Sequence, residues 1–159
     1  MMSAQEAMFG AGCFWGVEAT FAHVPGVLET VVGYAGGTLP NPTYDQVCSH
    51  STGHAEVIWL RFDPAIISYT KLLEIFFENH NPTLLNRQGP DIGSQYRSVI
   101  FYDNEEQHDL AFKAIEDLEA AKKYDKKIVT QVVPTTPFYR AEEYHQRYLE
   151  KKGQSHCGK

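Results

Sequence analysis

Apolar positions along the chain follow two different periods, and these separate predicted strands from predicted helices. Short runs rich in β-branched and aromatic residues predict strands over 5–11, 27–34, 57–62, 95–102 and 128–133. Apolar residues spaced three and four apart predict helices over 14–23, 68–79, 103–123 and 138–149. Ser68 can cap the second helix, and Asp103 with Glu106 can form a capping box for the third.

Two long polar segments, 38–53 and 80–94, interrupt this succession. Loops of that length in compact domains are often functional. Strands and helices otherwise alternate imperfectly, which predicts one α/β (α+β) domain with helices packed on a mixed sheet. We expect this domain to span residues 1–150 and the polar tail 151–159 to be mobile.

The strand 57–62 shows the clearest alternation, and it gives the glutamate before it a possible function. One face carries Glu56, Ile58, Leu60 and Phe62 and is the more apolar, so we expect it to face the core. Glu56 would then lie at the rim of an apolar face, where desolvation raises the pKa of a carboxyl group. A carboxylic acid that stays protonated can donate a proton. The alternative is a solvated glutamate at a strand end.

Composition narrows the class of protein. The 159 residues are 43% hydrophobic and carry a formal charge of −6, which disfavours a nucleic-acid or anionic-membrane surface. The apolar runs are too short to span a bilayer, and the first residues lack the pattern of a signal peptide. Cys13, Cys48 and Cys157 are too far apart for a disulfide framework. We therefore expect a reducing, cytoplasmic location in which any disulfide is transient.

A cysteine lies where the first strand meets the first helix, within Gly12-Cys13-Phe14-Trp15-Gly16. Backbone N–H groups and the positive end of a helix dipole favour the thiolate there, and the thiolate is the nucleophilic form. Phe14 and Trp15 could form the wall of an apolar pocket beside the sulfur. The alternative is a buried cysteine in an aromatic core.

Other cysteine and histidine chemistry remains open at this point. Cys48, His50 and His54 could suggest a metal site, but the chain lacks a second cysteine-rich pair, so we predict no metal. Cys13 could pair with His54 or His145 in a hydrolase, although no local hydrolase signature supports this.

The cysteine in the tail suggests redox chemistry instead. A reactive Cys13 could become a sulfenic acid, which Cys157 would attack to form a disulfide that an external reductase opens. A thiol peroxidase, which would consume peroxide rapidly at Cys13, is another hypothesis. The alternative is that Cys157 is an exposed thiol without function.

Seven stretches together carry a resemblance to a known family. They are Gly12-Cys13-Phe14-Trp15-Gly16, Gly33-Tyr34-Ala35-Gly36-Gly37, Asn41-Pro42-Thr43-Tyr44, Gly53-His54-Ala55-Glu56, Asn86-Arg87-Gln88-Gly89, Asp91-Ile92-Gly93-Ser94-Gln95-Tyr96-Arg97-Ser98 and Tyr144-His145-Gln146. In this order they resemble the peptide-methionine sulfoxide reductase A family, from Gly10 nearly to the end of the chain. The resemblance implies a two-layer α/β plait with a ferredoxin-like core, a mixed sheet, flanking helices and long loops.

The resemblance also implies an activity, the reduction of methionine S-sulfoxide, free or in oxidised proteins, to methionine. Cys13 would be the nucleophile, and Phe14 and Trp15 would bind the S-methyl group of the substrate. Glu56 would protonate the sulfoxide oxygen. The site would need no cofactor, because thioredoxin would be the external reductant, and we expect the protein to be a monomer.

The remaining roles implied by the resemblance concern the sulfoxide oxygen and the return to the reduced state. Tyr44 and Tyr96 would hydrogen-bond that oxygen, and Asp91 would help to hold the substrate or a nearby water. Cys157 matches the usual resolving position only loosely, which leaves Cys48 as a rival. We prefer Cys157, because a disulfide needs Cα atoms within about 7 Å and a mobile tail can meet that requirement.

Overall fold

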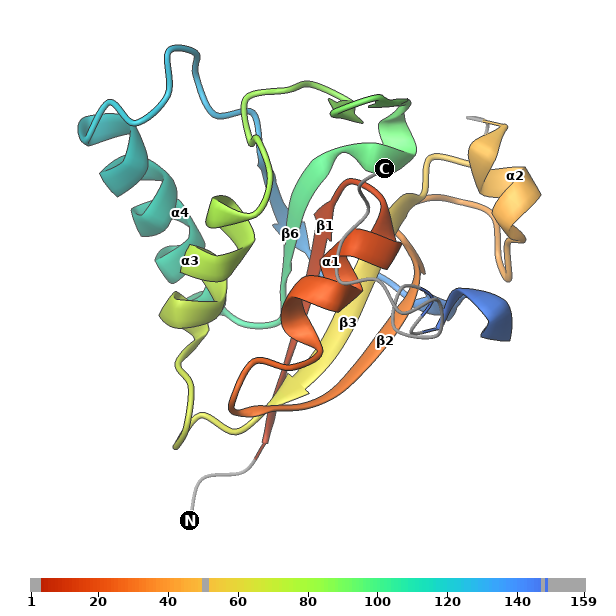
Figure 1. The fold of residues 1–159 in the computed structure, drawn as a ribbon, viewed down its shortest axis with the longest axis horizontal. Coiled ribbons are helices and arrows are strands. Elements are labelled where there is room, and N and C mark those ends of the chain that lie inside the picture. The colour runs from red at the N-terminus through yellow and green to blue at the C-terminus, as the bar shows by residue number, and fades with distance from the viewer. Residues whose placement is uncertain (1–3, 50–51, 147, 149–159) are drawn as a thin grey trace.

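A six-stranded mixed sheet forms the centre of the computed structural model, which describes residues 4–49, 52–146 and 148 (Figure 1). Its strands lie in the order β7-β6-β1-β3-β2-β8. The β6–β7 pair is parallel and the other pairs in this sheet are antiparallel, so the prediction of a mixed sheet is confirmed. The bounds are β1 Gln5–Ala11, β2 Val27–Ala35, β3 Ala55–Phe62, β6 Ser98–Tyr102, β7 Gln131–Pro134 and β8 Tyr139–Arg140.

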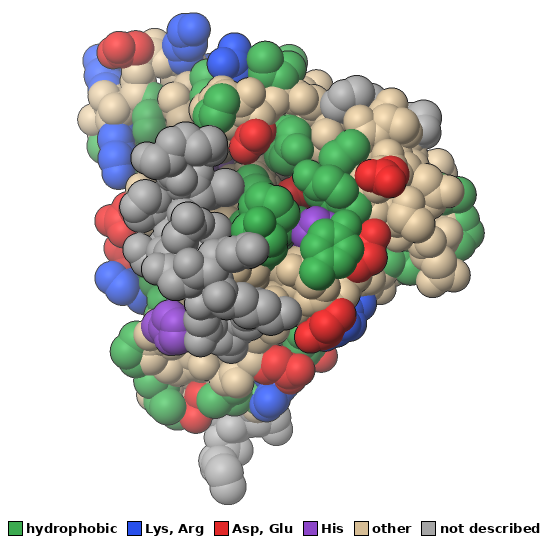
Figure 2. All heavy atoms as spheres, turned by 45° about the vertical axis from the view of Figure 1, so that its right-hand side comes forward, with side chains coloured by type: hydrophobic (Ala, Val, Ile, Leu, Met, Phe, Trp, Pro, Cys, Tyr) green, Lys and Arg blue, Asp and Glu red, His purple; other side chains and the backbone are tan. Residues whose placement is uncertain are grey.

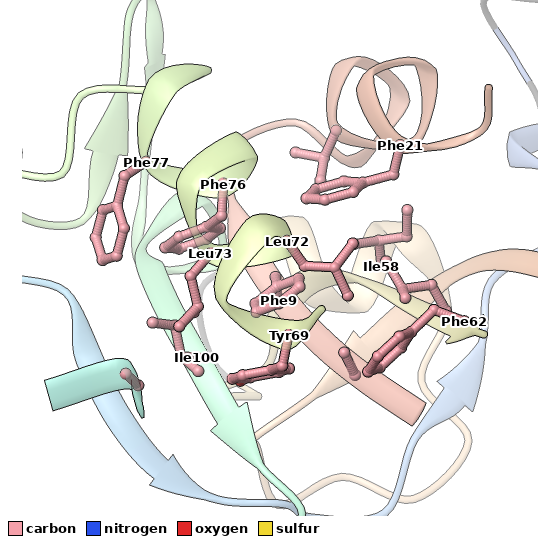
Figure 3. Close-up of a cluster of buried hydrophobic side chains, with 14 of the residues drawn as sticks. Phe9, Phe21, Ile58, Phe62, Tyr69, Leu72, Leu73, Phe76, Phe77 and Ile100 are labelled. Atoms are coloured by element: carbon pink, nitrogen blue, oxygen red, sulfur yellow. The ribbon is translucent and has the colours of Figure 1, made fainter. Parts of the chain in front are cut away.

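Three helices cover one face of this sheet: α1 Phe14–Phe21, α3 Tyr69–Glu78 and α4 Glu105–Ala120. Their apolar side chains meet those of β1, β3 and β6 in the main core, where Phe9 stacks on Phe21 and lies against Phe76 (Figure 3). Burial of such side chains, at about 1.5–3 kcal/mol each, fixes α1 against β1. The junction between these two elements is therefore held in place by the core.

The alternation predicted for β3 is confirmed. Ile58, Leu60 and Phe62 point into the main core beneath the helices. Val57 points to the opposite face, where it packs in a second buried cluster with Met8, Ala35, Ala55, Val99 and Phe101. The start of this central strand is thus covered on both faces, which is why Val57 is as buried as its neighbours, whereas Trp59 and Arg61 farther along the same face are half-buried.

The prediction of a helix over 138–149 is wrong for residues 138–146. This segment begins with the edge strand β8 and continues as a short 3₁₀ helix, η2 Glu143–His145. The side chain of Gln146 accepts a hydrogen bond from the Val32 N–H (3.0 Å) and donates one to the Val32 C=O (2.9 Å). The carboxamide thus pairs with β2 as a peptide group would, and this tertiary pairing competes with a helix.

Other boundaries differ locally. The segment 38–53 is not all loop, because α2 Tyr44–Cys48 forms within it, capped by Thr43 and Gln46. Ser68 caps α3 as predicted. The third predicted helix, α4, is capped one residue later than expected, by Asn104 with Gln107 in place of Asp103 with Glu106. The last two predicted strands are shorter, since the 3₁₀ helix η1 Ser94–Tyr96 precedes β6 and β7 begins at residue 131.

Outside the main sheet, β4 Arg87–Gln88 pairs with β5 Asp91–Ile92 in a small hairpin. Within the described ranges, no helix is both long and apolar enough to cross a membrane. The tail 151–159, and with it the predicted resolving cysteine Cys157, lies outside the described residues.

Candidate active site

Cys13 occupies the N-cap position of α1, directly after β1. Its carbonyl accepts a hydrogen bond from the Val17 N–H at 3.3 Å, and the residue is half-buried. The turn before it contains Gly12 at φ +96°, a backbone conformation that residues other than glycine rarely adopt. The sulfur-bearing residue therefore lies at the positive end of a helix, as the sequence predicted.

Glu56 lies next to this turn, at the start of β3. It is 1% exposed, and its Oε1 accepts a hydrogen bond from the backbone N–H of Phe14 at 3.2 Å. Phe14 is the first residue of α1 and the neighbour of Cys13 in the chain. The carboxyl group is thus buried rather than solvated, and it is tied to the helix turn that carries the thiol.

Two tyrosines from different elements face this carboxyl group. Tyr44 begins α2 and Tyr96 ends η1, and their hydroxyls interact with each other. Burial raises the pKa of both phenols, and Glu56, when ionised, raises each of them further. Both hydroxyls therefore remain protonated and can donate hydrogen bonds at neutral pH. Asp91, in β5, is close enough to Tyr96 to raise its pKa as well.

An aromatic cluster extends from the same point. The ring of Phe14 lies 6.5 Å from that of Tyr44 and 5.1 Å from that of His145, and Trp15 stacks on Tyr148 at 3.8 Å. Figure 2, turned so that α2 and η2 come forward, shows hydrophobic side chains gathered on this face with acidic side chains at their border. The structure thus brings together the predicted residues Cys13, Phe14, Trp15, Tyr44, Glu56, Asp91 and Tyr96.

His145 fixes Trp15, a function that the sequence did not suggest. The indole Nε1–H donates to Nδ1 of His145 at 2.9 Å, and the imidazole is 1% exposed. Nδ1 accepts only when it carries no proton, so this bond requires the neutral tautomer protonated at Nε2. Burial lowers the pKa of His145, against a smaller opposing effect of Glu142, and so favours that form. In the sequence, the only indication that His145 matters is that it lies in the Tyr144-His145-Gln146 stretch, which gives no hint of the bond to Trp15.

Glu142 and Tyr34 form a second support that sequence reasoning missed. Glu142 accepts a hydrogen bond from the Tyr34 hydroxyl at 2.9 Å and another from the Tyr44 N–H at 3.0 Å. Tyr34 is fully buried, and its ring lies 5.7 Å from that of Phe14. One carboxylate thus joins the edge of the sheet to α2 and holds Tyr44 in place. In the sequence, Glu142 resembles an ordinary solvated glutamate, and nothing near it predicts its bonds to Tyr34 and Tyr44.

Cys48 lies among these groups rather than in a separate loop. Its thiol interacts with Tyr44 and Gln95, and burial is the largest effect that raises its pKa. A raised pKa keeps Cys48 in the thiol form, which is a poor nucleophile. Cys48 therefore borders the two tyrosines in its thiol form.

The two histidines considered as hydrolase bases are engaged elsewhere. Nδ1 of His54 accepts from the Gly37 N–H at 3.0 Å, and Nε2 lies 2.7 Å from the Leu39 carbonyl. His54 therefore connects its own segment to the turn at 37–39, and His145 accepts the hydrogen bond from Trp15. In the described part of the chain, the side chains that could converge on a metal ion lie on α4, away from this site: Glu105, His108 and Asp109.

Fold and site together define a cysteine-centred α/β protein in which a helix-capping thiol adjoins a buried carboxyl group, two phenols and an aromatic cluster. The profile of the family described as "Peptide methionine sulfoxide reductase" matches residues 5–159. The chain belongs to this family.

Curated relatives agree. The chain is 58% identical to peptide methionine sulfoxide reductase MsrA of Acidobacterium capsulatum over 152 residues, or 96% of this chain and 97% of the relative. It is 55% identical to MsrA of Methanosarcina acetivorans over 94% of this chain and 79% of that protein. Among solved structures, reduced Mxr1 of Saccharomyces cerevisiae matches with a TM-score of 0.88 at 36% identity, covering 95% of this chain and 87% of that one. MsrA of Corynebacterium diphtheriae matches with a TM-score of 0.86 at 34% identity, covering 99% and 79%.

Proposed function

We propose that this protein reduces methionine S-sulfoxide, free and within oxidised proteins, to methionine. The observation that carries the proposal is the hydrogen bond from the Phe14 N–H to Glu56, which holds a buried acid beside the turn that bears Cys13. Membership of the family supports the same activity. The preference for the S epimer follows from the family resemblance.

In the first step, the Cys13 thiolate attacks the sulfoxide sulfur while Glu56 delivers a proton to the oxygen. Removal from water favours the neutral carboxylic acid, which is the form that can give up a proton. The hydroxyls of Tyr44 and Tyr96 donate to the same oxygen as negative charge develops on it. The bond between the substrate sulfur and the protonated oxygen then breaks, and the hydroxyl passes to the sulfur of Cys13. Methionine leaves with the electron pair, Cys13 becomes a sulfenic acid and Glu56 a carboxylate, so the substrate is reduced and the thiol oxidised by two electrons.

Binding of the substrate uses the aromatic cluster. A methyl group on sulfur gains apolar contact with Phe14 and Trp15, which a more polar substituent would lose. The indole is oriented by its hydrogen bond to His145, so the pocket is formed before the substrate arrives. We assign Asp91 to holding the substrate or a nearby water, since it lies beside Tyr96.

In the second step, Cys157 attacks the sulfenic acid of Cys13, water leaves, and a disulfide forms. Thioredoxin then reduces this disulfide. We favour Cys157 over Cys48 because burial raises the pKa of Cys48 and so reduces its thiolate fraction. The relative Mxr1 has been solved in a reduced form, in an unusual oxidized form and in complex with Trx2. The cycle suits a monomer in a reducing compartment such as the cytoplasm and uses no bound cofactor.

One assay separates this activity from a thiol peroxidase or a Cys-His hydrolase. The purified protein is incubated with resolved S and R epimers of methionine sulfoxide and dithiothreitol, and methionine is quantified. We expect methionine from the S epimer and none from the Cys13→Ser variant. Absence of methionine from the S epimer would refute the proposed function.

Disulfide mapping after stoichiometric substrate, without reductant, tests the resolving step. A Cys13–Cys157 peptide is expected, and the Cys157→Ser variant should complete one turnover with thioredoxin and then stop. A Cys13–Cys48 peptide would assign the resolving thiol to Cys48 instead.

A further inference from the structure

A cavity of about 280 Å³ opens beside Cys13, away from the aromatic cluster. Its walls come from α1, from the end of α3 and from the β4–β5 hairpin. It shares Cys13 and Asp91 with the site described above, whereas Phe14, Trp15, Tyr44, Glu56 and Tyr96 do not line it. Its size is at the low end for sites that hold whole small molecules, so it suits a single side chain better than a second substrate.

Three polar side chains in the cavity wall already have hydrogen-bond partners. The Thr20 hydroxyl donates to the Gly16 carbonyl (3.0 Å), and the amide of Asn79 donates to the Ile75 carbonyl (2.8 Å). Gln88 is bonded at both ends of its amide, since Oε1 accepts from the Asn81 N–H and Nε2 donates to the Asn81 C=O. An occupant therefore finds few hydrogen-bond partners that are not already used, which disfavours a polar occupant.

The surfaces left for contact are apolar. The remaining lining includes Ala11, Val17 and Pro90, with Phe21 and Phe76 at the floor, where each is 1% exposed. Asp91 adds a carboxylate to the lining, which repels an acidic side chain. The lining thus favours an uncharged, apolar group.

The turn before Cys13 and the β4–β5 hairpin, which border the cavity, pack directly against each other. A Cβ atom at Gly12 would lie 2.8 Å from Cβ of Gln88, so the turn before Cys13 already touches the hairpin. The hairpin is fixed by the pairing of Gln88 with Asp91 and by the bonds to Asn81. A preformed cavity gives binding energy without a cost of reorganisation.

We propose that this cavity is a subsite for an apolar side chain within two positions of the oxidised methionine in a polypeptide substrate. This inference rests on the proposed function, because only a substrate bound at Cys13 brings a neighbouring side chain to the cavity. Side chains two apart in an extended peptide lie about 7 Å from each other on one face, so one residue can enter the aromatic cluster and its neighbour the cavity. Free methionine sulfoxide leaves the subsite empty.

The test compares kcat/KM for short blocked peptides that contain methionine S-sulfoxide. Gly, Leu, Phe or Glu is placed at each of the two positions on either side, and dithiothreitol serves as the reductant. At one or more positions we expect Leu and Phe to be favoured roughly tenfold over Gly, and Glu to fall below Gly. Equal rates for Leu, Phe and Gly at every position would overturn the proposal.

Two variants that fill the cavity from opposite walls test whether the preference for Leu and Phe arises in this cavity. Thr20→Phe acts from α1 and Asn79→Phe from the exposed end of α3, while Thr20→Val removes the hydroxyl without filling the space. Either Phe variant should reduce the Leu preference to about the Gly level and leave turnover of free methionine S-sulfoxide within about twofold of the original. Thr20→Val should keep the preference.

Three results would contradict the proposal that this cavity is a subsite. A Leu preference that survives both Phe variants would place its origin elsewhere. An equal loss with free methionine sulfoxide would show that the cavity is part of the reaction site itself. If the unmodified protein reduces neither free nor peptide sulfoxide, the proposed function fails first, and the subsite fails with it.

Discussion

Replacement of Glu56 by Gln tests the step on which the chemistry depends. The substitution keeps the shape of the side chain. The amide oxygen can still accept the hydrogen bond from the Phe14 N–H, which is 3.2 Å long with Glu56 in place. What is lost is the acidic proton at a position that is 1% exposed, where water cannot readily replace it. General acid catalysis contributes about 10²–10⁴ in rate, so the chemical step should slow by that factor, or about 3–5 kcal/mol in barrier height.

The assay is a single-turnover measurement of methionine formed from methionine S-sulfoxide, with thermal unfolding monitored in parallel. The matched control is Glu142→Gln, which changes a nearby carboxylate that supports Tyr34 and Tyr44 rather than the reacting atoms. This control should raise KM more than it lowers the single-turnover rate. If Glu56→Gln slows that rate by less than about threefold, with stability unchanged, Glu56 is not the proton donor.

Three further predictions concern groups around the site. His145→Leu leaves the half-buried indole N–H of Trp15 without its acceptor, which should lower kcat/KM about tenfold. His145→Asn supplies an oxygen acceptor and should restore part of the lost kcat/KM; an equal loss in both variants would contradict this. The pKa of His80 is lowered to about 4, mainly by burial, so acid disfavours the folded state: stability should be complete above pH 6.5 and fall by about 3 kcal/mol as pH drops towards 4. Chemical denaturation at several pH values measures this fall, which should be smaller in His80→Asn. Gly37→Ala would place a Cβ against the backbone of His54 and should destabilise the protein by about 1–3 kcal/mol, measured by denaturant unfolding. The comparison is Gly89→Ala, whose Cβ meets nothing within 4 Å, so that its cost comes from the backbone strain at φ +56° alone.

Local pattern was sufficient for several features of the fold. The strand that ends at Ala11, the cap at Ser68 and the alternation in β3 all depend on neighbouring residues or on a simple period, so they were predicted correctly. Capping by Thr43 and Gln46 is equally local, but within a long polar segment it was overlooked, and α2 was missed.

Features that depend on distant residues could not be predicted in this way. The segment 138–149 has a helical pattern, but Gln146 pairs with Val32, 114 residues away, and β8 pairs with β2. Likewise, Glu142 looks like a solvated residue until Tyr34 and Tyr44 are placed beside it. A tertiary hydrogen bond can outweigh a weak local preference, because each buried polar group must find a partner.

The sequence alone determined the chemistry of this protein: a cysteine at a strand-to-helix junction, a carboxyl group before an alternating strand, and a series of stretches that identify its family. Those features depend on residue types and short spacings, which a sequence displays directly. Only the tertiary structure decided the surroundings of that chemistry: the bond from Phe14 to Glu56, the orientation of Trp15 by His145, and the cavity beside Cys13. Each of these joins elements far apart in the chain, and their geometry is set by packing rather than by any local pattern.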